Sequence, residues 1–382
     1  MHRLQFHYTL SKGGSPALAP TVRNPLIDLL QAVASQGSIS AGARTLGLSY
    51  RHVWGELKRW EKELGHELVV WEKGQSARLT EFGTKLMWAE RQAQARLAPQ
   101  IEALRAELER SFAVAFDDAA HVVTLYASHD DALSALREHA LQGHGQGGQD
   151  HGRLHLDIRF TGSVDAIRAL NEGRCVMAGF HTLQNTGTNT LSERIYKPLL
   201  QPGLHKIIGF AQRTQGLMVA PGNPLGLNGL TDLKRTGARF ANRALGSGTR
   251  VVLDELLPKA GLNGSDINGY EHTEPSHAAV AHAVLAGQCD AGLGIEAAAQ
   301  QAGLTFVPLA KERYHLVCLK SALEQPGISV LLDLLQTPQW QAKIATIPGY
   351  TALQSGEVLS LRKVLPWWEF REKTLKQVNE VN

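Results

Sequence analysis

Residues 37–83, GSISAGARTLGLSYRHVWGELKRWEKELGHELVVWEKGQSARLTEFG, decide the fold of the first part of the chain. Ser38 is suited to cap a short helix and Gly47 to end it, because glycine tolerates the left-handed conformation of a tight turn. Ser49 then caps a second helix, which the apolar spacing predicts over about residues 49–64. Two helices joined by a glycine turn indicate a helix-turn-helix.

The predicted second helix has one apolar and one basic face. Apolar residues recur at helical spacing, at Val53, Leu57, Trp60 and Leu64. The opposite side carries Arg51, Gly55, Lys58 and Lys62, flanked by Trp54 and Arg59. A basic helix face with a small residue at its centre suits close approach to a DNA groove, because phosphates attract the positive charge. The alternative is a small helical bundle whose lysines are solvated.

Two short strand-like runs, Glu67–Trp71 and Ala77–Thr80, flank the tip at residues 73–76 and predict a β-hairpin. Such a hairpin is a wing beside the helix-turn-helix, with Lys73 and Arg78 near phosphates. The candidate DNA-contacting residues are Ser49, Tyr50, Arg51, His52, Trp54, Gly55, Lys58, Arg59, Lys73 and Arg78.

The segments on either side of this motif differ. Residues 1–20 contain two glycines and two prolines without apolar periodicity, which predicts a flexible tail. Residues 80–110 predict a long helix that Thr80 caps and that Pro99 kinks or breaks. Its apolar stripe consists of Leu86, Ala93, Leu97, Ile101, Leu104 and Leu108. A long striped helix with few local partners usually packs against a second copy, so we expect a homodimer.

Composition indicates a soluble protein of two or three domains. The 382 residues are 43% hydrophobic and 20% charged. No apolar run approaches the roughly 18 residues that cross a bilayer, and the start of the chain lacks a secretion signal. The three cysteines are scattered, which argues against a disulfide framework and a zinc site, so we expect a cytoplasmic protein. Residues 1–112 carry a net charge of +4 and the remainder −1, as in a nucleic-acid-binding head on a neutral body.

The stretches AGARTLGLSYRHVWGELKRWEKELG, VVWEKG and LTEFG resemble the winged-helix head of molybdate-responsive (ModE-type) regulators and, more distantly, that of LysR-type regulators. The resemblance covers roughly residues 22–110. It implies a homodimer that the long helix holds together, with each copy reading half of a palindromic site on double-stranded DNA. The loop KGQSA is shorter than the glycine-rich wing of the molybdate regulators, which leaves the wing contacts open.

From about residue 120, short apolar runs alternate with helical stretches, the pattern of a mostly parallel α/β sheet. Residues 139–155 form a loop rich in glycine, histidine and glutamine without metal-ligand spacing. Five Ser/Thr/Gly clusters stand at predicted strand ends: residues 126–130, 161–165, 179–182, 246–250 and 276–277. Hydroxyl and N–H groups at helix N-termini favour anions, although ordinary helix capping explains any single cluster.

Enzyme motifs do not account for these clusters. Residues 246–250, GSGTR, lack the spacing and the lysine of a P-loop. Residues 292–299, GLGIEAAA, match the dinucleotide-binding fingerprint only in part, with Ala297 in the third glycine position. His277 near Glu274 is a conceivable base, but no nucleophile stands near it in the sequence. We therefore expect no enzyme activity.

Residues 120–320, in stretches such as LYASHDDALSAL, GSVDAIRALNEGRCVMAGFHT and GYEHTEPSHAAVAHAVLAGQCDAGLGIEAAAQ, resemble the periplasmic-binding-protein-like domains fused to such heads. The resemblance implies two α/β lobes, with strands crossing near residues 209–216 and 307–314 and a ligand between the lobes. In similar molybdate and tungstate binders, hydroxyl and N–H groups from both lobes hold the oxyanion. The candidate ligand-binding residues are Ser128, His129, Asp130, Gly162, Ser163, His181, Ser247, Gly248, Thr249, Arg250, Ser276 and His277.

Arg250 also allows a larger anion, because a guanidinium binds organic carboxylates and phosphates with two hydrogen bonds. Arg243 is either a second such group or a surface residue, and we favour the surface. The sequence thus predicts a winged helix-turn-helix over 21–80, a linker helix over 81–112 and a periplasmic-binding-protein-like domain over 113–382. In that domain, lobe one takes about 120–208 and 315–365, and lobe two about 209–314.

The predicted function is a cytoplasmic transcription regulator that senses molybdate, tungstate or a molybdenum-cofactor-related anion. We expect it to require no cofactor or metal. The alternatives are an anion-binding or storage protein without a DNA role and an enzyme acting on an anionic substrate.

Overall fold

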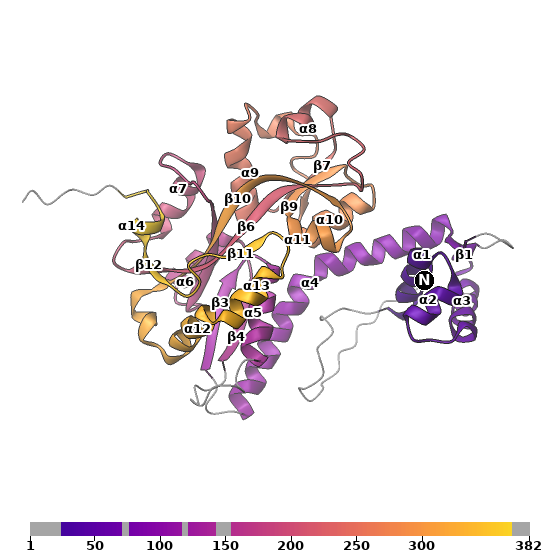
Figure 1. Cartoon of the computed structure of the whole chain (residues 1–382), viewed down its shortest axis with the longest axis horizontal. Helices are drawn as coiled ribbons and strands as arrows, with labels where there is room; N and C mark the ends of the chain where they lie inside the picture. The colour runs from indigo at the N-terminus through magenta and orange to yellow at the C-terminus, as the bar shows by residue number, and fades with distance from the viewer. Residues whose placement is uncertain (1–23, 71–75, 117–120, 143–153, 369–382) are drawn as a thin grey trace, which may run out of the picture.

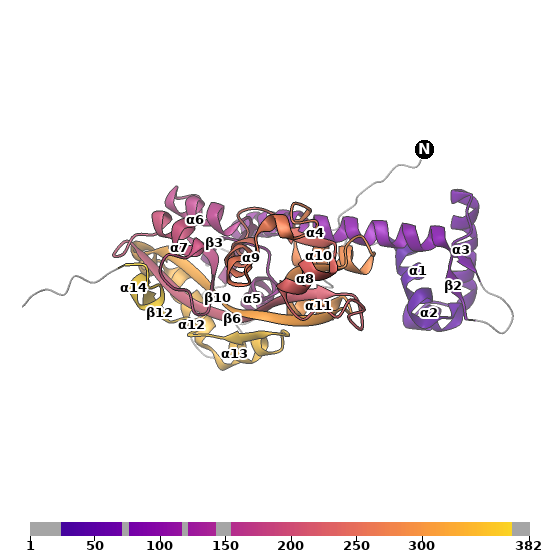
Figure 2. The same cartoon turned by 90° about the horizontal axis from the view of Figure 1, so that it is seen from above.

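A computed structural model describes residues 24–70, 76–116, 121–142 and 154–368. A small helical head lies at the start of one long helix, and a larger α/β body packs along the rest of that helix (Figure 1, Figure 2). The predicted tail at 1–20, the tip of the hairpin and most of the histidine-rich loop lie outside the described residues. No helix in the described part is long and apolar enough to cross a membrane.

The head consists of three helices and a two-stranded hairpin. They are α1 (Pro25–Gln36), α2 (Ile39–Thr45), α3 (Tyr50–Leu64), β1 (Val69–Val70) and β2 (Arg78–Leu79). Ser38 and Ser49 cap α2 and α3 as predicted, and Gly47 between them has a φ of 67°. Val53 and Leu57 on α3 are buried in the core of the head. The amphipathic pattern of the sequence therefore gives the helix-turn-helix directly.

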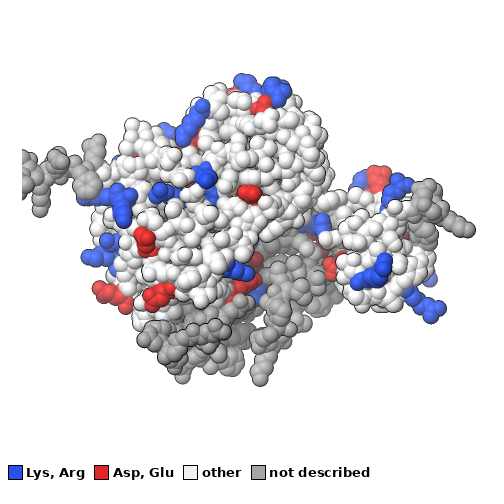
Figure 3. Space-filling model, viewed as in Figure 1, with Lys and Arg blue, Asp and Glu red and all other residues white. Residues whose placement is uncertain are grey.

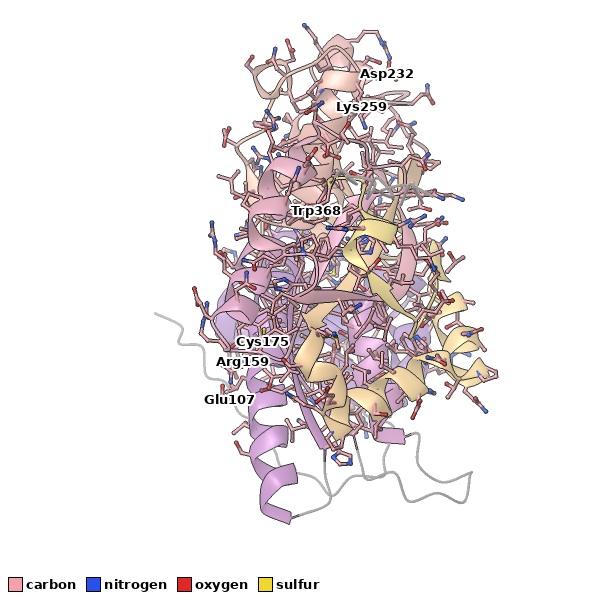
Figure 4. All side chains as sticks on the ribbon, turned by 90° about the vertical axis from the view of Figure 1, so that its left-hand side faces the viewer. Glu107, Arg159, Cys175, Asp232, Lys259 and Trp368 are labelled. Carbon is pink, nitrogen blue, oxygen red and sulfur yellow. The ribbon has the colours of Figure 1, made fainter. Side chains whose placement is uncertain are left out.

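The long helix α4 spans Glu81–Phe116 and joins the head to the body. Pro99 lies inside it without ending it, and Figure 1 shows the helix changing direction along its length. Its first part packs against helix α10 (His277–Leu285), and its later part runs along strand β4 (Leu154–Phe160). In Figure 4, Glu107 of α4 lies beside Arg159 of β4. One helix thus contacts both lobes of the body.

Lobe one is built on parallel strands. These are β3 (His121–Ala127), β4 and β5 (Met177–Leu183), which pair in the order β4-β3-β5. The helices of this part of the chain are α5 (Asp131–Gln142), α6 (Ser163–Asn171), α7 (Leu191–Tyr196) and η1 (Lys197–Leu199). The C-terminal elements also pack here: η3 (Lys320–Glu324), α12 (Pro326–Gln336), α13 (Pro338–Ala345), β11 (Tyr350–Ala352), β12 (Val358–Ser360) and α14 (Leu361–Val364).

Lobe two has the same construction on a smaller scale. Its strands are β7 (Phe240–Arg243), β8 (Thr273–Glu274) and β9 (Ala291–Ile295), and β7 pairs in parallel with both others. Its helices are α8 (Leu230–Thr236), α9 (Gly248–Lys259), η2 (Gly264–Asp266), α10 and α11 (Glu296–Gln301). In Figure 4, Asp232 and Lys259 mark this lobe at the top, and Arg159 and Cys175 mark lobe one below.

Two long antiparallel strands, β6 (His205–Val219) and β10 (Thr305–Leu319), run through both lobes. Their pairing extends from His205 opposite Leu319 to Val219 opposite Thr305. The main sheet therefore has the order β4-β3-β5-β10-β6-β9-β7-β8. The crossings expected near 209–216 and 307–314 lie within these two strands, and the predicted two-lobed α/β fold is confirmed.

Candidate functional site

The head exposes the N-terminal half of α3. Tyr50, Arg51 and His52 are exposed there, and a Cβ added to Gly55 would meet nothing within 4 Å. The ring of Tyr50 stacks on that of Trp54, with centroids 6.4 Å apart. Arg51 makes no ion pair within the described part of the chain, so its guanidinium is available to a phosphate or a base edge.

Two other predicted DNA contacts are held by neighbouring carboxylates. Lys58 Nζ lies 2.6 Å from Glu61 Oε2, and Arg59 lies 2.6 Å from Glu56 Oε2. Arg78 is exposed on β2, whereas Lys73 lies outside the described residues. Figure 3 shows Lys and Arg side chains on the visible face of the head. The predicted residues of α3 therefore share one surface, although Glu56 and Glu61 partly neutralise it.

In the body, strands β5, β6 and β10 carry a buried polar cluster. His181 comes from β5, Arg213 and Gln215 from β6, and Glu312 and Tyr314 from β10, and all five are nearly or fully inaccessible. The rings of His181 and Tyr314 lie 4.0 Å apart. Only His181 is among the residues predicted from the sequence. The other four stand in continuous polar runs, residues 212–215 of β6 and 311–315 of β10, so alternation along the strands does not single them out.

Arg213 is the centre of this cluster. It forms ion pairs with Asp130 of lobe one and with Glu312 of β10. Tyr350 donates a hydrogen bond of 2.6 Å to Asp130 Oδ2, and the Ala132 amide donates one of 2.8 Å to Asp130 Oδ1. The predicted ligand contact Asp130 is therefore engaged by the protein itself, and its charge holds Arg213 in place.

The stretch 246–250 closes over the cluster from lobe two. A Cβ on Gly248 would lie 2.6 Å from His181 Nδ1, and one on Gly162 would lie 2.8 Å from the Gly246 carbonyl oxygen. Only glycine fits at either position, because a real Cβ does not approach other atoms this closely. Lobe one and lobe two therefore touch at the predicted cleft.

Hydroxyl and imidazole groups from both lobes complete the cleft. Ser128 Oγ and Ser163 Oγ lie 3.4 Å apart in lobe one. In lobe two, Thr249 Oγ1 accepts a 3.1 Å hydrogen bond from Gln215 and lies 3.5 Å from His277 Nε2. Both lobes thus contribute predicted residues to one buried site.

Arg243, for which the sequence favoured a surface position, is in fact buried. It ends β7 and is 3% exposed. Its Nη2 donates to the Pro275 carbonyl at 3.0 Å, while Nε and Nη1 have no hydrogen-bond partner among the described residues. Burial, reinforced by the charge of Arg213, lowers its pKa to about 9. The expectation failed because residues distant in the sequence, among them Pro275 and Arg213, lie near this side chain.

Four other predicted residues are directed elsewhere. Arg250 stacks on Tyr270 at 4.0 Å and pairs with Asp254 at 3.2 Å. Ser247 caps α9, where its oxygen accepts from the Arg250 amide. His129 lies 3.3 Å from Glu102 of α4, and Ser276 donates to the Ala95 carbonyl of α4 at 3.1 Å. These contacts join Arg250 and Ser247 to their own lobe and His129 and Ser276 to α4.

The two cleft histidines are neutral. Burial lowers the pKa of His181 and of His277 well below its usual range, and the charges of Arg213 and Arg243 lower both further. Neither ring nitrogen of His181 has a hydrogen-bond partner in the described chain, and neither does His277 Nδ1. Buried polar atoms are normally satisfied, so this concentration of unsatisfied groups indicates a binding site.

Residues 274–277, from the end of β8 to the start of α10, connect the cleft to α4. Arg96 of α4 donates two hydrogen bonds, of 2.9 and 2.7 Å, to the buried carboxylate of Glu274. Gln92 of α4 and Gln288 exchange hydrogen bonds of 2.6 and 2.8 Å. Residues 274–277 therefore contact α4 on one side and Arg243 and Thr249 on the other. We call these contacts of Gln92, Ala95 and Arg96 the α4 clasp.

Other candidate sites are weaker. The described residues contain no group of three or more histidine, cysteine, aspartate or glutamate side chains that could hold a metal ion. A cavity of about 380 Å³ lies between α1, α4, α10 and α11, with Glu90, Arg91 and His282 on its wall. It has no buried charged cluster comparable to the one in the cleft.

Comparison with known families covers both parts of the chain. Residues 146–336, half of the chain, match the PBP superfamily domain. Residues 26–84 match the bacterial regulatory helix-turn-helix protein, lysR family. The second match covers α1 to β2 of the head, and the first includes most of both lobes.

Two curated relatives are themselves uncharacterized. YvgK of Bacillus subtilis is 32% identical over 201 residues, which are 53% of this chain and 64% of YvgK. The chain thus matches slightly less than two thirds of that relative. An uncharacterized protein in the ferredoxin 2Fe-2S gene 5' region of Clostridium pasteurianum is 32% identical over 111 residues, 29% of this chain and 98% of that protein.

Solved structures align with most of this chain, but only loosely. A hydrogen-peroxide-bound mutant of OxyR from Corynebacterium glutamicum gives a TM-score of 0.44 at 15% identity, covering 84% of this chain and 93% of OxyR. ArgP from Mycobacterium tuberculosis gives 0.37 at 22% identity, covering 81% and 95%. Scores this low do not support the transfer of residues or ligands. The family matches decide the assignment: the chain belongs to the PBP superfamily and carries a lysR-family helix-turn-helix ahead of its PBP domain.

Proposed function

We propose that this chain is a cytoplasmic transcription regulator that binds double-stranded DNA through its head and a small anion through its body. The observation that carries the proposal is the pairing of a lysR-family helix-turn-helix with a two-lobed domain whose cleft holds unsatisfied buried donors. We propose a regulatory rather than an enzymatic role, because the helix-turn-helix of the head matches a family of bacterial regulatory proteins.

In the head, we propose that α3 enters the major groove and that the hairpin touches phosphate. Tyr50, Arg51 and His52 lie at the N-terminal end of α3, which is the end that usually reaches base edges. Lys58 and Arg59 are already paired with carboxylates, so they contribute less than Arg51. Ser49, Trp54, Gly55, Lys73 and Arg78 complete the proposed surface.

In the body, we propose that the anion binds beside Arg243, within reach of the other polar groups of the cleft. These are Ser128, Ser163, His181, Thr249 and His277. Arg243 is a buried guanidinium without a carboxylate partner among the described residues, and a buried cation of this kind is costly unless an anion joins it. The sequence resemblance makes molybdate, tungstate and molybdenum-cofactor-related species the candidate ligands.

We propose that the α4 clasp transmits ligand binding in the cleft to the DNA-binding head. Residues 274–277 contact both the cleft and α4, and α4 continues into the head. Closure of the lobes on the anion shifts this segment, and α4 then reorients the head, as in hinge-type switches.

We further propose a homodimer that forms along α4. Leu97, Leu104 and Leu108 recur on one side of this helix and are 36–57% exposed in the single chain. A second copy that covers this stripe would bury the leucines, and the paired heads would read two half-sites of a palindromic operator.

The test is binding of a fluorescent duplex DNA by the full chain at several salt concentrations. We expect the affinity for DNA to fall steeply as the salt concentration rises. Arg51→Ala should reduce the slope of log affinity against log salt concentration by about the contribution of one released counterion. Lys343→Ala, which removes an exposed cation of α13 on the body, is the control and should bind like the wild type. Binding that does not depend on salt, or an equal loss of DNA affinity in both variants, would count against a DNA-binding role for the head.

A further inference from the structure

The cleft contains a buried hydrogen-bond acceptor as well as donors. Gln215 lies on β6 and is fully buried. Its Nε2 donates to Thr249 Oγ1 at 3.1 Å and to Glu312 Oε1 at 3.0 Å. These two bonds use both amide hydrogens and fix the orientation of the amide. Gln215 Oε1 is therefore an acceptor, and it has no partner among the described residues.

Glu312 provides a second such oxygen next to Gln215. Its Oε1 takes the hydrogen bonds from Arg213 and Gln215, while Oε2 is buried and has no partner in the described part of the chain. Arg213 is shared with Asp130, so a single guanidinium faces two carboxylates. Gln215 and Glu312 therefore offer two hydrogen-bond acceptors in an acidic part of the cleft.

Other groups of the cleft are donors. Arg243 presents Nε and Nη1, and its charge has no carboxylate partner among the described residues. Tyr314, whose ring lies 4.0 Å from that of His181, presents a buried hydroxyl without a partner in the described chain. Leaving a buried polar group unsatisfied is unfavourable, so a ligand that satisfies only the donors or only the acceptors leaves the other set unsatisfied.

We propose that the ligand is amphoteric: it has an anionic group that binds Arg243 and at least one N–H or O–H group that donates to Gln215 and Glu312. This inference rests on the proposed ligand-binding function of the cleft. Fully ionised molybdate and tungstate offer only acceptors, so they leave both oxygens unsatisfied and bring negative charge towards Glu312. Among the candidate ligands, a cofactor-related molecule with both a phosphate and ring N–H groups fits this pattern.

The experiment compares matched probes by the thermal stabilisation of the full-length wild-type chain. The probes are sodium molybdate, sodium tungstate, and three pairs that differ by an amino group: acetate and glycine, methylphosphonate and aminomethylphosphonate, and benzoate and 2-aminobenzoate. Pterin-6-carboxylate is added as a larger amphoteric probe. Ligands that bind only the folded state raise the melting temperature in proportion to RT ln(1 + [L]/Kd), so the shifts rank affinities.

We expect concentration-dependent shifts only from probes that carry both groups, with the donor-bearing member of a pair binding at least about tenfold more tightly. Arg243→Met should abolish these shifts. Arg239→Met, which breaks an exposed ion pair with Asp290 in the same lobe, should keep them. If Arg243→Met does not fold, Arg243→Lys replaces it and should reduce the shifts.

A second variant tests the acceptor oxygen of Gln215 separately. Gln215→Met removes the acceptor while keeping the side chain similar in length, so the preference for the donor-bearing member should fall. An equal or larger shift from molybdate, tungstate or the donor-free members would overturn the inference and leave the proposed function standing. No shift from any probe would contradict the proposed function itself.

Discussion

The ion pair between Arg96 and Glu274 gives the sharpest prediction about the α4 clasp. Glu274 has a side chain with no exposed surface, whereas the side chain of Arg96 is 48% exposed. Arg96→Met removes both hydrogen bonds to the buried carboxylate, and among the described residues it leaves only His272 near it, at 3.6 Å. Hydrogen bonds to charged groups contribute about 1.5–3 kcal/mol. Because solvent screens Arg96, we expect the contact between α4 and lobe two to lose about 2 kcal/mol of stability, in the lower part of that range.

Amide hydrogen exchange of the native protein measures this loss directly. About 2 kcal/mol corresponds to a roughly 30-fold faster exchange for amides that open when α4 leaves the body. The effect should be confined to peptides around residues 90–100 and to α10, while the core strand β3 exchanges as in the wild type.

The matched control is Arg168→Met. Arg168 pairs with Asp165 on the surface of α6, where the two side chains are 57% and 62% exposed. Exposed pairs contribute at most about 1 kcal/mol, so exchange should barely change. Identical profiles for Arg96→Met and the wild type, or equal effects of the two substitutions, would refute the view that the clasp holds α4 against lobe two.

Three further predictions concern other parts of the chain. Ser247→Ala should lower the free energy of unfolding of the body by about 1 kcal/mol in urea titrations, because Ser247 caps α9; no change would refute that role. The burial of His315 lowers its pKa to about 3. His315 should therefore contribute about 2 kcal/mol to the stability that the wild type loses as the pH falls from 7 to 5, since at this position only the unfolded chain binds the proton, and a His315→Gln variant should lack this part of the loss. Leu104→Glu should convert the proposed dimer into a monomer by light scattering, because Leu104 is 57% exposed on the stripe of α4; a persisting dimer would place the interface elsewhere.

The sequence predicts most of the head because its signals are local. The caps at Ser38 and Ser49 and the spacing of Val53 and Leu57 lie within a few residues of each other, and the helices form where they indicate. The crossing strands were also recognisable. Their polar residues were not, because a single strand does not reveal which of its faces the other lobe will cover.

The two arginines of lobe two illustrate the same limit. Arg250 was predicted to bind the ligand, but it follows Gly248 by two residues on α9, a rotation of about 200°. When Gly248 faces His181, Arg250 therefore points towards Tyr270 and Asp254. Arg243 was expected at the surface because nothing in its neighbourhood along the chain indicates burial. Its environment comes from residues such as Pro275 and Arg213, which only the tertiary structure brings near.

The most direct test of the central claim is selection of binding sites from a random pool of double-stranded DNA by the full-length chain. A regulator with paired heads should enrich two inverted half-sites whose centres lie about one helical turn apart, and Arg51→Ala should lose the enrichment. A pool that stays random, or that Arg51→Ala enriches equally well, would contradict the assignment of the head as a DNA reader.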